Sequence, residues 1–94
     1  MSQFLVRHKV KDYSKWKPVF DEHGAKRKAA GSKGGRLFRS EKDPNDVVIL
    51  FEWEDPGKAH QFAESQDLRQ AMERAGVVGK PDLHFLEELE KVSA

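Results

Sequence analysis

Hydrophobic residues are most concentrated in the middle of the chain. Residues 46–55, Asp-Val-Val-Ile-Leu-Phe-Glu-Trp-Glu-Asp, contain five consecutive large apolar residues followed by Glu-Trp-Glu. A short apolar run with β-branched and aromatic residues is typical of a central strand, here buried on both faces at first and half-exposed at its end. One face of this strand is apolar throughout and carries Val47, Ile49, Phe51 and Trp53. We expect helices to cover that face.

The segments on either side predict the order strand, helix, strand, strand, helix, strand. The predicted elements are a strand over 3–10, a helix over 12–30, a strand over 36–40, the central strand, a helix over 56–75 and a strand over 82–92. Residues 31–35, Gly-Ser-Lys-Gly-Gly, predict a flexible turn, and loops are predicted over 41–45 and 77–81. The switch from alternation to a helical period near Asp12 supports the first boundary, with Asp12 as the N-cap.

Local signals refine the two helices. Pro18 lies past the first turn of the first helix and is expected to kink or tighten its start. Asp55 followed by Pro56 predicts an N-cap with proline at the first helical position. Ser65 can cap a continuation, so we expect the second helix to break or bend near residues 65–67 and to end at Gly76.

This pattern predicts an α+β fold. Two helices on one face of a four-stranded antiparallel sheet give the ferredoxin-like βαββαβ architecture, as a single domain over residues 1–94. Leu5, Val48 and Leu50 are apolar residues on the face without helices. We therefore expect two sheets to pack face to face in a homodimer that closes an eight-stranded, barrel-like core.

Composition narrows the classes of function. Only 37% of the residues are hydrophobic and 35% are charged, which favours a small core extended by oligomerisation. The net charge of +1 provides no global attraction to nucleic acid or to an anionic membrane, and no stretch approaches the roughly 20 apolar residues of a membrane span. The chain has no cysteine, and Arg7, His8 and Lys9 interrupt any signal-peptide-like run. We expect a cytoplasmic protein.

Three motifs that would indicate a more specific function, a phosphate loop, a metal site and an RNA-binding surface, are not supported by the sequence. Residues 31–35 lack the Gly-x4-Gly-Lys-Ser/Thr pattern of a phosphate loop and lie between a predicted helix and a predicted strand. The consecutive residues 21–23, Asp-Glu-His, point about 100° apart on a helix, so we predict no metal site. The element order also matches RNA-recognition domains, but Glu52 and Glu54 on the central strand disfavour RNA binding.

Several segments carry a resemblance to a known family. They are Val10–His23, Gly35–Arg39, Leu50–Glu54, Phe62–Arg69 and Ala75–Gly79. Together they resemble bacterial proteins of the dimeric α/β barrel superfamily close to the antibiotic biosynthesis monooxygenases. The resemblance implies a ferredoxin-like protomer, a homodimer and a small pocket between sheet and helices. Relatives of this kind include cofactor-free monooxygenases, polyketide-cyclase-like enzymes and many members with no established activity, and they share no invariant catalytic motif.

Polar residues at inward-facing positions suggest where such a pocket would lie. His23 and Arg27 fall on the inner arc of the first helix, and His8 has the parity of the inward residues of the first strand. The residues expected to surround them are Trp16, Phe20, Phe51, Trp53, Phe62 and, as a further candidate, His84. A neutral histidine could take a proton from a planar phenolic or enolisable molecule without a cofactor. Arg27 could stabilise the resulting anion, which then reacts with oxygen or closes a ring.

A structural interpretation competes with this one. His8 and His23 would then be hydrogen-bonded histidines near the core, and Arg27 would extend its guanidinium to solvent. His60 is expected to face solvent on the second helix. A second hypothesis for the function is a non-catalytic homodimeric domain that binds a small apolar or aromatic molecule in the same pocket, without a titrating base inside it, and a purely structural role is a third.

Overall fold

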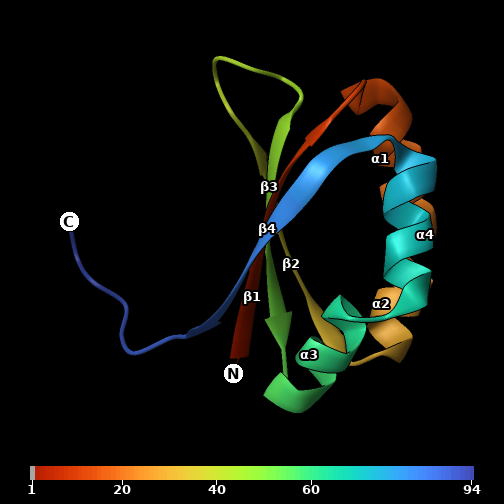
Figure 1. The fold of residues 1–94 in the computed structure, drawn as a ribbon. Coiled ribbons are helices and arrows are strands. Elements are labelled where there is room, and N and C mark those ends of the chain that lie inside the picture. Colours follow the sequence, from red (N-terminus) through yellow and green to blue (C-terminus); the bar gives the residue numbers. More distant parts are fainter. Residues whose placement is uncertain (1) are drawn as a thin grey trace.

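One layer of sheet and one layer of helices form the protein (Figure 1). The computed structural model describes residues 2–94. The elements are β1 (Ser2–Val10), α1 (Tyr13–Glu22), α2 (Gly24–Ala29), β2 (Ser32–Arg39), β3 (Asp46–Trp53), α3 (Pro56–Ala63), α4 (Gln66–Ala75) and β4 (Val77–Glu87). Each described helix lies on the same side of the sheet, and the opposite side carries no helix within residues 2–94 (Figure 1). The predicted ferredoxin-like α+β architecture is confirmed.

The sheet is antiparallel throughout, with the strand order β2-β3-β1-β4. The predicted central strand β3 pairs with both β1 and β2. Its register with β1 places Phe4 opposite Phe51 and His8 opposite Val47. The alternating side chains of both strands therefore project their apolar sets into the same space beneath the helices.

The core fills that space. Its buried members are Phe4, Val6, Val10, Trp16, Val47, Ile49, Phe51, Trp53, Ala59, Phe62 and Ala75. Trp53 is completely buried, and its indole Nε1 donates a hydrogen bond to the Ala30 carbonyl oxygen at 3.2 Å. Burial of a large apolar side chain stabilises a protein by about 1.5–3 kcal/mol. Trp53 adds a polar tether between the end of α2 and β3.

The predicted helix signals are largely confirmed. Carboxylate or hydroxyl oxygens of Asp12, Asp55 and Ser65 accept hydrogen bonds from the backbone N–H groups of Ser14, Gly57 and Leu68. Gly76 ends α4 with φ at 81°, a left-handed conformation that glycine adopts without steric cost. Among residues 2–94, no helix combines the length and the apolar character that crossing a membrane requires.

The first predicted helix is divided differently from expectation. Pro18 lies inside α1, and the break falls between α1 and α2 at His23 and Gly24. Proline at position 18 removes one helical hydrogen bond without ending the helix, whereas glycine is a weak helix former where the chain changes direction. The break places His23 at a corner between two helices.

The predicted turn over residues 31–35 is wrong at its end. Gly31 turns with φ at 113°, but β2 already begins at Ser32 and contains a bulge between Ser32 and Gly34. Gly35 lies within the strand, where a Cβ atom would stand 2.3 Å from the Leu50 carbonyl oxygen of β3. Gly35 is therefore required for close backbone approach and not for a turn.

The last strand also begins earlier than predicted. β4 runs through the segment 77–81, which was expected to be a loop, and a shift of register between Arg7 and Lys9 of β1 accommodates its path. Pro81 is tolerated because β4 is an edge strand. The strand ends at Glu87, and the remaining segment extends away from the sheet on the side without helices (Figure 1).

The face without helices carries an apolar centre. Leu5, Val48 and Leu50 are partly exposed there, and Phe38 of β2 is 48% exposed. Arg7 forms an ion pair with Asp46 at 2.8 Å near one end of this face. The second subunit expected on this surface stays a prediction.

Candidate functional site

A small cavity lies between the sheet and the helix layer. Its volume is about 50 Å³, measured as the space open to the centre of a water molecule. The predicted site residues that line it are His8, Trp16, Phe20, His23, Arg27, Phe51 and Phe62. None of the described residues that line it is acidic. Two imidazoles and one guanidinium therefore meet within an otherwise apolar enclosure.

Different elements supply the three polar groups. His8 comes from β1, where its register opposite Val47 directs it toward the helices. His23 lies at the corner between α1 and α2, and Arg27 follows one turn later on α2. The alternation of β1 and the break after α1 thus bring these side chains to one cavity.

His8 is buried and has no hydrogen-bond partner. Only 7% of the residue is exposed, and neither ring nitrogen is hydrogen-bonded within residues 2–94. Its ring meets Trp16 edge-on, with the ring centres 5.7 Å apart. Burial lowers the pKa of His8 from 6.5 to about 4, because the charged imidazolium is poorly solvated there. His8 is therefore neutral near pH 7.

His23 is as buried as His8, with 7% of the residue exposed, but it lies at the border of the cavity. Its Nε2 atom has no hydrogen-bond partner within residues 2–94, and its ring centre lies 5.8 Å from that of Phe62. Burial lowers the pKa of His23, and the positive charge of Arg27 lowers it further. His23 also borders an outer hollow that contains Asp67 and Arg74, so its ring lies between the cavity and the surface. A proton accepted by this ring has a short path to solvent.

Arg27 lies against aromatic faces. Its Cζ atom is 4.0 Å from the Phe20 ring centre and 5.6 Å from that of Phe51. Its Nη1 atom donates a hydrogen bond to the Phe20 carbonyl oxygen at 2.8 Å, and no carboxylate within residues 2–94 forms an ion pair with it. Burial lowers the pKa of Arg27, but a guanidinium remains charged in proteins. Cation–π contacts partly offset the loss of water around this charge.

The structural interpretation expected hydrogen-bonded histidines and a guanidinium directed to solvent. Both ring nitrogens of His8 and the Nε2 atom of His23 are buried without a hydrogen-bond partner within residues 2–94, and the Arg27 guanidinium packs on the Phe20 ring. His60 is exposed as predicted, with its ring stacked on Phe85 at 3.7 Å between centres.

Two predicted site residues do not line the cavity. Trp53 lies behind Phe51 and Phe62, with ring centres 6.1 and 5.0 Å away. His84 pairs with Leu5 and therefore lies on the face without helices. Trp53 supports the lining residues, and His84 is separated from the cavity by the sheet.

Residues of α4 and β4 complete the cavity lining. Leu68, Met72 and Ala75 lie on the inner face of α4, and Leu83 comes from β4. The helical spacing of the first three predicts an inward face, but core residues have the same spacing. No signal in the sequence separated the two roles.

Metal ligands are not gathered here. Over residues 2–94, no group of three or more His, Asp or Glu side chains is placed to hold a metal ion. Arg27 and the two histidines are the groups that can hold a polar ligand, and the predicted absence of a metal and of a cofactor stays a prediction.

Solved structures share this architecture. A protein titled antibiotic biosynthesis monooxygenase has 16% identity with the chain at a TM-score of 0.73, covering 96% of this chain and all of that one. A candidate antibiotic biosynthesis monooxygenase of Bordetella bronchiseptica has 17% identity and a TM-score of 0.80, covering 95% and 97%. A variant of SnoaB, a cofactor-independent oxygenase of Streptomyces nogalater, has 15% identity and a TM-score of 0.77, covering 99% and 97%.

These likenesses define the class of fold. The chain has the ferredoxin-like fold of the antibiotic biosynthesis monooxygenase-like proteins, so the resemblance in sequence is confirmed for the fold. No family model and no curated protein matches the sequence.

Proposed function

We propose that the protein is a cofactor-independent enzyme of the monooxygenase or polyketide-cyclase type. Its substrate is a small aromatic molecule with an acidic hydroxyl group or an enolisable carbon, bound in the cavity between sheet and helices. The fold shared with a cofactor-independent oxygenase supports the class. The observation that carries the proposal is a pair of buried histidines in which both ring nitrogens of His8 and the Nε2 atom of His23 have no hydrogen-bond partner within residues 2–94.

Unpartnered polar atoms are costly inside a protein. A buried donor or acceptor without a hydrogen bond costs about 1–3 kcal/mol. Natural proteins satisfy most such groups, and the exceptions are frequent at functional sites. A ligand hydroxyl or carbonyl group entering the cavity would pair with His8 or His23 and recover part of that cost.

The two histidines suit different roles. A base functions best when its pKa lies near the working pH, and a pKa of about 4 makes His8 a weak proton acceptor. We assign His8 as a neutral hydrogen-bond partner that orients the substrate. His23, at the border of the cavity, is the general base that removes the hydroxyl or carbon-bound proton.

Arg27 then stabilises the anion. A guanidinium without a competing carboxylate is suited to a phenolate or enolate oxygen. In the oxygenase reaction, the anion gives electrons to dioxygen, one oxygen atom enters the substrate as a carbonyl group, and the other leaves as water. In the cyclase reaction, the enolate carbon attacks a carbonyl carbon elsewhere in the same substrate molecule. The carbonyl π bond opens to an alkoxide, which takes back the proton that His23 had accepted.

The cavity is too small to bind an aromatic ring without a change in its lining. About 50 Å³ is less than the engineered cavity of about 150 Å³ that binds benzene. A ring-sized ligand therefore requires lining side chains to move. Met72, partly buried and flexible, is one that can do so.

The test measures binding and turnover in turn. A thermal-shift screen of phenolic and enolisable aromatic compounds is followed by oxygen uptake and product analysis on each hit. His23→Ala is expected to abolish turnover and to leave most of the stability, and Arg27→Lys is expected to reduce turnover because the planar donor pair is lost. Full activity in both variants would contradict the assigned roles. Binding without turnover in the wild type would favour the alternative, a non-catalytic binding protein.

We also propose that the protein is a homodimer formed by the helix-free faces of two sheets. The interface would then bury four apolar side chains that are partly or largely exposed in the single chain, Leu5, Phe38, Val48 and Leu50. The segment beyond β4 runs on the same side of the sheet (Figure 1), and its Leu89 and Val92 are 87% and 81% exposed, which supports an assembly that covers this side.

A further inference from the structure

A second hollow adjoins the cavity. It has a volume of about 150 Å³, lies between the first helices and β2, and shares Phe20, Arg27, Ile49 and Phe51 with the inner cavity. Arg27 and Phe20 therefore line both the inner cavity and the hollow beside β2. The outer hollow is about as large as the engineered cavity of about 150 Å³ that binds benzene, and the inner cavity adjoins it.

Arg27 has unused hydrogen-bonding capacity toward both spaces. A guanidinium carries five N–H donors in one plane. Within residues 2–94, the hydrogen bond to the Phe20 carbonyl oxygen is the one that Arg27 makes, and it forms no ion pair. The remaining donors are available to an acceptor that lies in either hollow.

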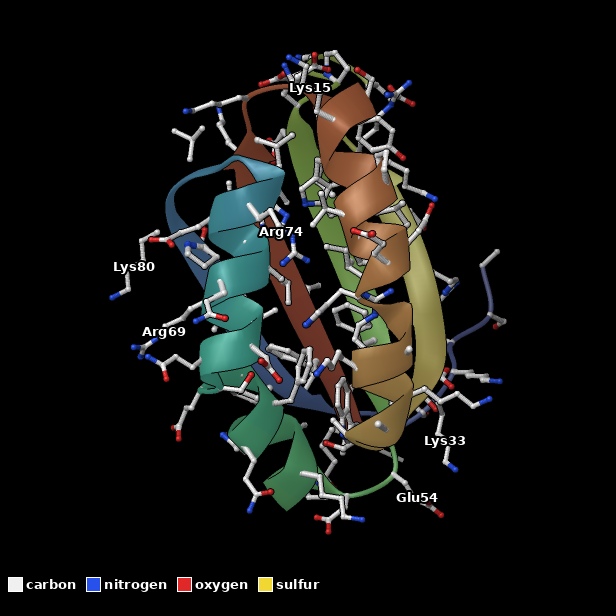
Figure 2. The ribbon with its side chains drawn as sticks, turned by 90° about the vertical axis from the view of Figure 1, so that its right-hand side faces the viewer. Lys15, Lys33, Glu54, Arg69, Arg74 and Lys80 are labelled. Atoms are coloured by element: carbon white, nitrogen blue, oxygen red, sulfur yellow. The ribbon has the colours of Figure 1, made fainter. Side chains whose placement is uncertain are left out.

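The surrounding charge favours an anion. Residues 23–40 contain six of the 17 basic residues of the chain and no acidic residue. The rest of the chain has 11 basic and all 16 acidic residues, so this segment is positively charged and the rest is negatively charged. This segment comprises α2 and β2, and among the described residues no Asp or Glu lines either hollow. Lys33, at the start of β2, is paired with Glu54 at 3.3 Å (Figure 2), whereas Arg27 forms no ion pair within residues 2–94.

Bare backbone lines the outer hollow. Gly34 has φ at 111°, and a Cβ atom there would meet no atom within 4 Å. β2 is an edge strand, and the Gly34 N–H group donates a hydrogen bond to the Ser32 hydroxyl at 3.2 Å. The outer hollow therefore offers room beside the Arg27 guanidinium, and the inner cavity offers aromatic faces.

We infer that the two spaces form one site for an aromatic monoanion. Its rings enter the inner cavity near His8 and Trp16 as lining side chains such as Met72 move, and its carboxylate-like group lies in the outer hollow on Arg27. The inference rests on the proposed function for the aromatic half of the site and adds the charge and orientation of the ligand. One guanidinium suits a single acidic group, and spaces of about 50 and 150 Å³ limit the ligand to one or two rings.

The test compares two probes that differ in charge. At pH 7.5, 1-naphthoate is anionic and 1-naphthamide is neutral, with the same ring system. Isothermal titration of the wild-type protein is expected to give at least about tenfold tighter binding of 1-naphthoate, the scale of one charge-assisted hydrogen bond. Equal affinities of the two probes would overturn the inferred anion subsite at Arg27 and would still support the aromatic subsite. Failure of both probes to bind would overturn the aromatic site and the proposed function together.

Matched variants locate the charge. Arg27→Gln should reduce the preference for 1-naphthoate to less than about twofold while retaining 1-naphthamide binding. Lys28→Gln removes one charge from an exposed neighbour and should retain the preference. A preference that survives in folded Arg27→Gln protein would overturn the assignment of the subsite. If Arg27→Gln does not fold, Arg27→Lys replaces it, and its preference should fall below that of the wild type.

Discussion

Replacement of His8 by leucine tests the description of the cavity through stability. His8 has a pKa of about 4 in the folded protein and an ordinary value of 6.5 when unfolded. Because the folded state binds the proton less tightly, acid favours the unfolded state. The free energy of unfolding is therefore unaffected by this group above pH 6.5 and falls as the pH drops from 6.5 through 4. The full difference corresponds to about 3 kcal/mol.

At pH 5, most of this penalty is already present. A group with these two pKa values lowers the free energy of unfolding by about 2 kcal/mol between pH 7.5 and pH 5. His8→Leu removes the titrating ring and its two unpartnered nitrogens, so the variant should also be about 1–3 kcal/mol more stable at pH 7.5. Carboxylates titrate in both proteins, and comparison of the two proteins cancels their contribution.

Urea denaturation at pH 5, 7.5 and 8.5 provides the assay. The difference in the free energy of unfolding between His8→Leu and wild type, called the stability gap here, should widen by about 2 kcal/mol from pH 7.5 to pH 5. From pH 7.5 to 8.5, the gap should stay constant, which serves as the internal control. A gap that does not widen on acidification would refute the buried, neutral and unpartnered state of His8.

Three further variants test the fold and the assembly. Gly35→Ala should lower the free energy of unfolding by about 2 kcal/mol or more, because its Cβ would clash with the Leu50 carbonyl oxygen, and an unchanged melting temperature would contradict the close approach of β2 and β3. Ser65→Ala removes the N-cap of α4 and should cost about 1 kcal/mol in urea denaturation, whereas an effect below about 0.3 kcal/mol would show that the cap is dispensable. Leu50→Glu should convert a particle of about twice 10.8 kDa into the 10.8 kDa monomer in light scattering, because it adds charge beside Glu52 on the proposed interface. A wild-type monomer, or a variant that remains dimeric, would remove this face as the interface.

Elements with strong local signals could be predicted from the sequence. The apolar run of β3 has one dominant interpretation, and the caps Asp55 and Ser65 act through hydrogen bonds to residues two and three positions away. Such interactions depend on neighbours in the chain, so a single sequence contains them.

The strands with glycine and proline were harder to predict. Gly34, Gly35, Gly79 and Pro81 are typical of turns, yet all four lie in β2 or β4. Their placement depends on contacts with β3 and β1, which are distant in sequence, and on the edge positions of both strands. Tertiary pairing therefore outweighed local preference.

Much of the candidate site was also foreseeable. Helical and strand periodicity predicted that His8, Trp16 and Arg27 face the space between sheet and helices, and in the structure they line the same cavity there. The face of His84 depends on how β4 pairs with β1, and the complete burial of Trp53 depends on how helices cover β3. Neither property is encoded in local spacing.

The most direct test of the central claim uses the four histidines of the chain as reporters. Two of them, His8 and His23, line the cavity, whereas His60 and His84 lie outside it. In ¹H–¹⁵N spectra of the imidazole rings, saturation with 1-naphthoate should shift the signals of His8 and His23 more than those of His60 and His84. Largest shifts at His60 or His84, or no shifts at saturation, would contradict a ligand site in this cavity.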